Sequence, residues 1–298
     1  MPSLIETLNG PWGWKWLRNR GRMRALTARI LIRHQGQRLE KFLAGASLKK
    51  SSCKTLREVA VSLTSWGPRL GFLPFVLLSL LEQMHKPNGI FVWLAKGDWD
   101  LLAPRIRERF QAEGVVFEIC NDLGPHTKWL PMIEGGYSAP FVICDDDIIY
   151  PTNWLGSLLD EDRVDAYTGA RCHQIVLENG IPTRYELWKK DIGWTANTSP
   201  LTFLTACGGG LLHPERIPKS YLCREQIRRK CPKADDIWLH AAHLKSGVPI
   251  YKTQFSFPCL EIPGSEGFGL LRQNVDAGGN DSQLGILQQQ WAKSFLKA

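Results

Sequence analysis

Three consecutive carboxylates, Asp145, Asp146 and Asp147, directly follow the apolar run at 141–144. A short apolar run predicts a buried strand, which places the carboxylates at the carboxyl edge of a sheet, where open α/β folds bind ligands. Adjacent carboxylates repel one another unless a cation neutralises them. Their hard oxygen atoms favour Mg²⁺ or Mn²⁺, ions that bridge protein carboxylates to substrate phosphates. The triplet therefore predicts a divalent-cation site, and its alternative is a solvated acidic turn.

A second acidic pair, Asp235 and Asp236, stands where a helix is expected to begin and run to about residue 246. One interpretation is structural, because aspartate at the N-cap or in the first turn is a common way to start a helix. Another is chemical. Asp236, His240 and His243 recur at i, i+4 and i+7 on one helical face, an arrangement that can bind a transition metal and would suit a metal-dependent hydrolase.

Polar and positive side chains stand near two other predicted strands. Thr64, Ser65 and Arg69 follow the apolar run at 59–63. The loop after the first strand of a parallel sheet is a common nucleotide site, where Arg69 would supply a fixed positive charge. Lys128 lies in a predicted short helix before the acidic strand, where it would neutralise a leaving diphosphate. Each cation also has a plain interpretation as a solvated surface residue.

Gly208, Gly209 and Gly210 form a glycine triplet. Glycine lets the backbone approach a sugar closely, but it also makes a flexible turn. His126, which follows Gly-Pro, either serves the site or simply begins a helix.

Apolar and polar segments alternate from residue 59 to 147. Strands are expected at 59–63, 90–94, 115–119 and 141–144, and helices at 72–84, 101–112 and 127–133. This alternation predicts right-handed βαβ crossovers and a mostly parallel sheet flanked by helices. After residue 151 the pattern predicts a strand and a hairpin over 164–190, with the turn at 178–180, then a helix at 234–246, a strand at 248–251 and a last helix at about 282–296.

The 298 residues are 44% hydrophobic and 22% charged, a composition that excludes collagen, coiled coil and global disorder. The longest apolar run, 70–81, contains Pro74 and is shorter than the ~18 residues that a membrane span needs. The eight cysteines include no C-x-x-C pair, so we expect reduced core thiols rather than disulfides or a zinc site. The N-terminus lacks the apolar region of a secretory signal, which favours a cytosolic location.

The net charge of +8 is concentrated at the N-terminus. Residues 1–50 hold eleven Lys and Arg against two Glu, a net charge of +9, and leave −1 for the rest of the chain. A neutral body argues against nucleic acid as a partner. Apolar residues at three-to-four spacing over 11–43 predict a basic amphipathic helix or helix pair, followed by a linker at 44–57. Together with Trp12, Trp14 and Trp16, this arm suits an anionic membrane surface.

Segment 143–151, the acidic triplet followed by Ile-Ile-Tyr-Pro, resembles the D-x-D motif of GT-A-fold glycosyltransferases, in particular the bacterial family-2-like enzymes that build surface polysaccharides. Four other segments fit the same pattern in order: 61–65, 124–128, 208–210 and 234–238. The resemblance implies a GT-A (Rossmann-like) domain at 51–298, with a nucleotide-binding half at 58–150 and an acceptor half at 151–298. The basic arm and linker at 1–50 lie outside it.

The resemblance also implies roles for the matching residues. Asp147, with Asp145, would coordinate Mn²⁺ or Mg²⁺, and Asp236, or else Asp235, would be the general base on the acceptor hydroxyl. The residues expected to bind the nucleotide-diphosphate sugar are Thr64, Ser65, Arg69, Lys128, Asp145, Asp146, Gly208 and Gly209. Asn280 and Asp281 would cap the last helix or belong to a segment that folds over the donor.

The resemblance and the motifs together predict metal-dependent transfer of a sugar from a nucleotide-diphosphate donor to a hydroxyl of a glycan or lipid-linked acceptor, by inversion. The expected setting is cell-surface polysaccharide synthesis, with the enzyme peripheral on the cytoplasmic face of the inner membrane. Two other classes stay open. One is a metal-dependent phosphoesterase or hydrolase that uses the triplet or the Asp-His-His face, and the other is a non-catalytic module that binds a nucleotide or sugar.

Overall fold

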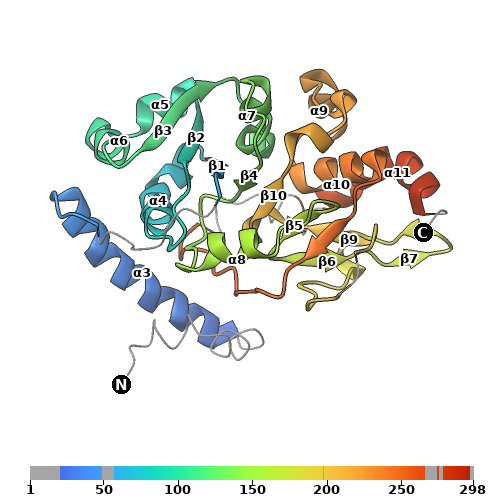
Figure 1. The fold of residues 1–298 in the computed structure, drawn as a ribbon, viewed down its shortest axis with the longest axis horizontal. Coiled ribbons are helices and arrows are strands. Elements are labelled where there is room, and N and C mark those ends of the chain that lie inside the picture. Colours follow the sequence, from blue (N-terminus) through green and yellow to red (C-terminus); the bar gives the residue numbers. More distant parts are fainter. Residues whose placement is uncertain (1–20, 49–56, 197, 266–273, 275–277, 296–298) are drawn as a thin grey trace.

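A seven-stranded sheet forms the centre of the protein in a computed structural model, which describes residues 21–48, 57–196, 198–265, 274 and 278–295 (Figure 1). The strand order is β11-β5-β10-β4-β1-β2-β3. The bounds are β1 Ala60–Thr64, β2 Gly89–Ala95, β3 Val115–Cys120, β4 Phe141–Ile143, β5 Tyr167–Gly169, β10 Gly210–Leu212 and β11 Ile250–Lys252. Only β10 runs antiparallel to its neighbours in this sheet. The predicted α/β class with a mostly parallel sheet flanked by helices is confirmed.

Alternate residues of the strands enter two hydrophobic cores, one on each face of the sheet. Val61 and Val142 face the first core, whereas Ala60, Phe141 and Ile143 face the second. This two-residue period explains why the strands appear as continuous apolar runs in the sequence, since both of their faces are buried.

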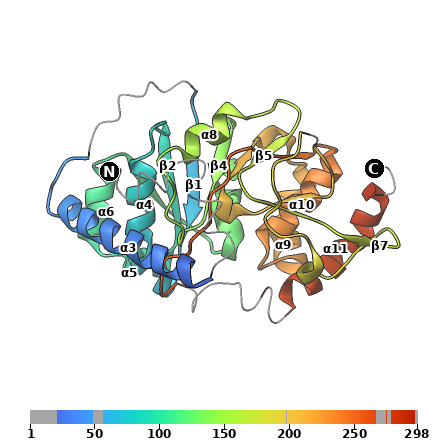
Figure 2. The same ribbon diagram turned by 90° about the horizontal axis from the view of Figure 1, so that it is seen from below.

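Two groups of helices cover these faces. The first core is covered by α3 Gly21–Leu43, α4 Leu73–Leu81, α6 Pro104–Gln111 and α8 Trp154–Asp160. The second is covered by α7 Leu130–Glu134, α9 Arg224–Lys230, α10 Asp235–Ser246 and α11 Gly279–Phe295. In Figure 2, α3, α4 and α6 of the first group lie at the left, and α9, α10 and α11 of the second lie at the right. Smaller sheets pair β6 Cys172–Gln174 with β9 Thr202–Leu204 and β7 Leu177–Glu178 with β8 Ile181–Pro182.

Proline marks the start of two helices. The helix expected at 101–112 is α6, which has Pro104 at its first position, and a separate short helix that was not predicted, α5 Lys96–Leu101, precedes it. The helix expected at 127–133 becomes a 3₁₀ turn, η2 Gly124–Lys128, followed by α7, with Pro131 in its first turn. Proline lacks the N–H that a helix interior needs but fits its first turn, so a new helix begins at each one.

Helix α3 forms the described part of the predicted basic arm and packs against α4 and α6 (Figures 1 and 2). Phe42 is buried, with its ring 5.0 Å from that of Phe110. The Arg109 guanidinium lies 3.8 Å from the Phe42 ring and donates to the Phe42 carbonyl at 2.9 Å. The opposite face exposes Leu26 and Ile30. The C-terminal part of this helix is therefore joined to the core of the body.

Trp12, Trp14 and Trp16 lie outside the described residues, as does most of the predicted linker. In the parts of the chain that the structure describes, no helix has the length and apolar character to cross a membrane.

The packing of α3 predicts a large loss of stability for Phe42→Ala. Truncating a buried phenylalanine typically costs about 3–5 kcal/mol, because apolar burial is lost and a cavity remains. Leu26→Ala, on the exposed face of the same helix, should change the free energy of unfolding by less than about 0.5 kcal/mol. Urea unfolding of both variants measures the difference. Equal stabilities would show that α3 does not pack on the body.

Candidate active site at the carboxyl edge of the sheet

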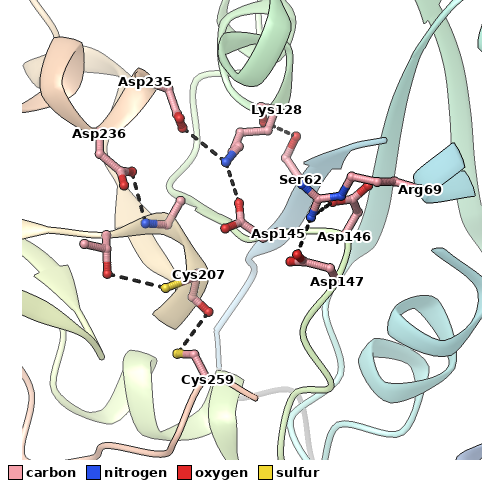
Figure 3. A network of polar contacts seen from close by, with 12 residues as sticks. Ser62, Arg69, Lys128, Asp145, Asp146, Asp147, Cys207, Asp235, Asp236 and Cys259 are labelled. Carbon is pink, nitrogen blue, oxygen red and sulfur yellow. Dashed lines mark hydrogen bonds and ion pairs between the residues drawn. The ribbon is translucent and has the colours of Figure 1, made fainter. Parts of the chain in front are cut away.

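The acidic triplet and the loop after β1 meet at one edge of the sheet, because β1 and β4 are neighbouring parallel strands. A single Arg69 nitrogen, Nη2, forms ion pairs with Asp146 Oδ1 at 2.5 Å and with Asp147 Oδ2 at 2.6 Å (Figure 3). Burial raises the pKa of Asp147 to about 8 although Arg69 opposes the shift, and it also raises that of Asp146. Burial therefore disfavours the charged form of both carboxyl groups, and Arg69 offsets this only in part.

Lys128 joins the third aspartate of the triplet to the start of α10. Its buried Nζ lies 2.5 Å from Asp145 Oδ1 and 3.2 Å from Asp235 Oδ2 (Figure 3). Burial alone would raise the pKa of Asp145, but the charge and hydrogen bond of Lys128 hold that pKa below its usual value. Ser62 of β1 donates to the Lys128 carbonyl at 2.6 Å, and Trp93 of β2 donates to Ser62 at 3.0 Å. The central strands thus fix the backbone of Lys128.

Asp235 and Asp236 stand in the first turn of α10 without capping it, because Ala234 is the N-cap residue and no side chain caps the helix. Asp236 Oδ1 accepts a hydrogen bond from the Ala206 amide at 3.1 Å. Burial, together with the neighbouring charge of Asp235, raises the pKa of Asp236 well above its usual value. A carboxyl group with a raised pKa at the edge of a sheet is suited to accepting a proton.

The glycine triplet is packed against side chains of the chain itself. A Cβ on Gly208 would lie 2.2 Å from Arg171 Cβ, and one on Gly209 would lie 2.5 Å from the Trp154 ring. Gly209 also has a φ of +93°, which favours glycine. Trp154 Nε1 donates to the Gly208 carbonyl at 2.7 Å. The close packing of Trp154 and Arg171 therefore explains why positions 208 and 209 are glycine, and no ligand is needed to explain it.

Other predicted residues lie around this edge or in the core. Ser65 is buried beside Asp146, and Thr64 donates to the Trp93 carbonyl at 2.8 Å. His126 is buried, with Nε2 2.6 Å from the Cys231 carbonyl, and burial lowers its pKa to about 3. It positions η2 and is not aimed at the acidic residues.

The predicted Asp-His-His face does not form a metal site. His240 and His243 are buried, with their rings 5.3 Å from Phe203 and 3.8 Å from Tyr167. Across the described ranges, no three His, Cys, Asp or Glu side chains are grouped as metal ligands. This includes the triplet, since Arg69 holds Asp146 and Asp147 while Lys128 holds Asp145.

Asp281 is also engaged away from the acidic residues. Its Oδ1 accepts a hydrogen bond from the Tyr185 amide at 2.7 Å, so it joins α11 to the 3₁₀ turn η3 Tyr185–Leu187.

Three residues that the sequence did not single out belong to the site. The Tyr150 hydroxyl accepts a hydrogen bond from the Asp145 amide at 2.9 Å and donates to the Cys207 carbonyl at 3.3 Å. Arg171 Nη1 lies 3.1 Å from Cys207 Sγ. Tyr150 stands close to the triplet in the sequence, which is a usable signal, but Arg171 and Cys207 are brought there by tertiary packing alone.

Comparison with known proteins finds similarity only at the level of solved structures. No protein-family model matches the chain, and no curated protein matches it. One similar structure is a mannosyltransferase from Pyrobaculum calidifontis with GDP-Man and Mn²⁺, at 11% identity over 90% of this chain and 80% of that chain, with a TM-score of 0.47. Another is 2-C-methyl-D-erythritol 4-phosphate cytidylyltransferase from Thermus thermophilus, at 14% identity over 74% of this chain and 98% of that chain, with a TM-score of 0.43. A third is the inositol-1-phosphate CTP transferase from T. maritima, at 11% identity over 68% of this chain and 87% of that chain, with a TM-score of 0.39.

These similar structures include both glycosyl- and nucleotidyltransferases. At these identities and TM-scores the likeness decides nothing about the reaction, so the functional argument has to come from the chemistry of the site.

The position of Lys128 predicts that Lys128→Met destabilises the protein by about 3–5 kcal/mol at neutral pH, because buried carboxylates lose their cation. Without Lys128 the pKa of Asp145 should rise, so the variant should lose more stability as the pH increases from 5 to 8. Denaturant unfolding at several pH values measures both effects.

Two further variants make this measurement specific. Lys245→Met removes an exposed lysine from the last turn of α10 and should change stability by less than about 0.5 kcal/mol. Adding Asp235→Asn to Lys128→Met should restore part of the loss. A Lys128→Met variant with wild-type stability at pH 8 would contradict the assigned ion pairs.

Proposed function

We propose that this protein transfers a sugar from a nucleotide-diphosphate donor to a hydroxyl of a glycan or lipid-linked acceptor, with a divalent cation and by inversion. The observation that carries the proposal is that the acidic triplet and the Asp235–Asp236 pair lie together, joined by the contacts of Lys128 with Asp145 and Asp235. Asp146 and Asp147 converge on one positive nitrogen, while Asp236 accepts a backbone N–H and has a raised pKa. Metal-dependent inverting sugar transfer uses such a pair, a cation site for the diphosphate and a base for the acceptor.

The arrangement at Asp146 and Asp147 fits Mn²⁺ or Mg²⁺. Arg69 Nη2 marks a point that both carboxylates contact, and oxygen ligands are those that these ions prefer. Burial raises the pKa of each residue, and a positive ion bound at this point would favour the charged form of both. When bound, the ion would neutralise charge on the donor diphosphate. The sequence assigned the metal to Asp147 and Asp145, and this geometry supports adding Asp146, because Asp145 is turned toward Lys128.

The remaining residues divide between donor and acceptor. Arg69 and Lys128 are the buried or nearly buried cations beside the triplet, so they would hold phosphate oxygens. Asp236 is the proposed general base, since Asp235 shares its charge with Lys128. Asp235 would position Lys128 and, through it, Asp145.

The rival classes differ in their products. A phosphoesterase would release phosphate from a monoester without any acceptor. A nucleotidyltransferase would release pyrophosphate from a nucleoside triphosphate, and a binding module would release nothing. The proposed activity releases a nucleoside diphosphate only when an acceptor is present.

The two carboxylate sites predict opposite effects for Asp147→Asn and Asp236→Asn. Asp147→Asn should stay folded, because burial penalises the charged form of this residue, but it should lose the Mn²⁺-dependent stabilisation by donor. Asp236→Asn should keep that stabilisation and lose about 10²–10⁴-fold in rate, as expected for a general base. A thermal-shift panel of nucleotide sugars with and without Mn²⁺ identifies the donor, since saturating ligand at 100 Kd adds about 2.7 kcal/mol.

Glu178→Gln, in the exposed β7–β8 hairpin, is the control and should leave both readouts unchanged. Wild-type turnover by Asp147→Asn in saturating donor and Mn²⁺ would refute the cation assignment. Loss of donor binding in Asp236→Asn would show that Asp236 binds the donor and is not the base on the acceptor.

We also propose that α3 holds the enzyme on an anionic membrane, on the cytoplasmic face where a lipid-linked acceptor for surface polysaccharide would be used. The exposed face of this helix presents Leu26 and Ile30 beside Arg29 and Arg33. Apolar residues flanked by cations suit a membrane interface, and Phe42 shows that the other face is already occupied by the body.

This proposal predicts that Arg29→Gln with Arg33→Gln weakens binding to anionic liposomes. Each basic residue near such a surface contributes about 1 kcal/mol, so the pair should cost up to about 30-fold in affinity. Arg228→Gln with Arg229→Gln, which removes the same charge from exposed positions on α9, should have little effect. Liposome flotation at low salt measures the binding, and a full-length protein that does not float would refute the membrane role.

A further inference from the structure

Two cysteines from separate parts of the chain lie together beside the acidic residues (Figure 3). Cys207 belongs to the 3₁₀ turn η4 Ala206–Gly208, and Cys259 lies in the segment after β11. Cys259 Sγ donates to the Cys207 carbonyl oxygen at 3.4 Å, so the two cysteines are in contact. Both residues are partly exposed, and neither forms a disulfide.

The surroundings of Cys207 favour its thiolate form. Arg171 Nη1 lies 3.1 Å from Cys207 Sγ, and Thr205 Oγ1 lies 3.6 Å from it. The hydrogen bond with Cys259, helped by the charge of Arg171 and opposed by burial, lowers the pKa of Cys207 to about 6. The thiolate is the reactive form of cysteine. The other titratable groups around it are Asp145, Tyr185 and Asp236.

Cys207 lies between the two carboxylate sites. The amide of its neighbour Ala206 donates to Asp236, and its own carbonyl accepts from Tyr150, which in turn accepts from the Asp145 amide. The segment that carries Cys259 reaches the triplet as well, because the Ile262 amide donates to the Asp147 carbonyl at 2.8 Å. A disulfide between Cys207 and Cys259 would therefore shift the backbone segments that contact Asp236 and the acidic triplet.

We propose that Cys207 is a peroxide-sensitive thiol and that Cys259 is its resolving partner. The Cys207 thiolate attacks a hydroperoxide such as H₂O₂, an S–O bond forms as the O–O bond breaks, and the leaving hydroxide takes a proton to become water. The Cys259 sulfur then attacks the Cys207 sulfur. An S–S bond forms, the S–O bond breaks, and the oxygen leaves as a second water with the Cys259 proton. Two thiols are oxidised and one peroxide is reduced to two waters.

Peroxide treatment of the full-length protein, followed by peptide mass spectrometry, tests this chemistry without any substrate. We expect one linked peptide that joins Cys207 to Cys259, lighter by two hydrogens and restored by dithiothreitol. In Cys259→Ser the link should disappear and a sulfenic acid should be trapped by dimedone at Cys207. Cys223→Ser, which removes an exposed thiol at the start of α9, should not change the result. Absence of the linked peptide, or no dimedone label at Cys207 in Cys259→Ser, would overturn the proposal.

The pH dependence of alkylation tests the assigned environment. The rate of iodoacetamide labelling at Cys207 is divided by the rate for a synthetic peptide of residues 203–212 under the same conditions. Because an ordinary cysteine ionises near pH 8.5, this ratio should fall about 100-fold between pH 6 and pH 9. Arg171→Gln should make the fall smaller, and Arg171→Lys should restore part of it. A ratio that is independent of pH would overturn the thiolate assignment.

One consequence rests on the proposed function: the oxidised protein should lose its donor-induced thermal shift and regain it with dithiothreitol. If the linked peptide forms but no donor ever shifts the melting temperature, the thiol chemistry stands and the proposed transferase fails. If the donor shift is present and is unchanged by the disulfide, the control of the site by oxidation is wrong.

Discussion

The Lys128 ammonium group contacts carboxylates from two distant parts of the chain, Asp145 after β4 and Asp235 at the start of α10. Burying a charged lysine costs free energy unless partners replace its water. Here the partners are carboxylates that would repel each other without Lys128. The positive charge therefore lowers the free-energy cost of burying the two negative charges, and they lower the cost of burying the positive one. Lys128 at the end of η2 and Asp145 after β4 come from the first half of the chain, and α10 comes from the second. This ion network therefore fixes how the two halves meet, and the site lies where they do.

The network does not offset the full cost of burying the carboxylates at this edge. Arg69 is shared by Asp146 and Asp147, and the pKa of each is still raised, because burial penalises the charged form more than Arg69 favours it. Asp236 has a raised pKa for the same reasons of burial and like charge. Buried carboxyl groups with raised pKa values are typical of functional sites. A cation bound with a diphosphate would supply the missing positive charge, and an acceptor hydroxyl would give Asp236 a proton to take.

The sequence was most informative where a functional residue follows a strong local pattern. The acidic triplet ends an apolar strand, and Asp235 and Asp236 begin a helix, so spacing alone placed them at an element end. The parallel order of β1 and β4 then brings Arg69 to the triplet. What spacing could not show depends on tertiary packing. Strand β10 was missed because glycine weakens its strand signal, and the glycines themselves are explained by Trp154 and Arg171. Arg171 and Cys207 lack any local motif, and Pro104 and Pro131 set helix starts that periodicity alone did not reveal.

The central claim is that the point between Asp146 and Asp147 is a cation site for a nucleotide-diphosphate donor. The most direct measurement is a crystal structure of the wild-type protein grown with Mn²⁺ and the nucleoside diphosphate of the donor identified by thermal shift, with data collected at the manganese absorption edge. Our account predicts an anomalous peak in contact with Asp147 and with a phosphate oxygen, and the Arg69 guanidinium turned away from the two carboxylates. A nucleotide bound at this edge with no anomalous peak, and with Arg69 still between Asp146 and Asp147, would contradict it.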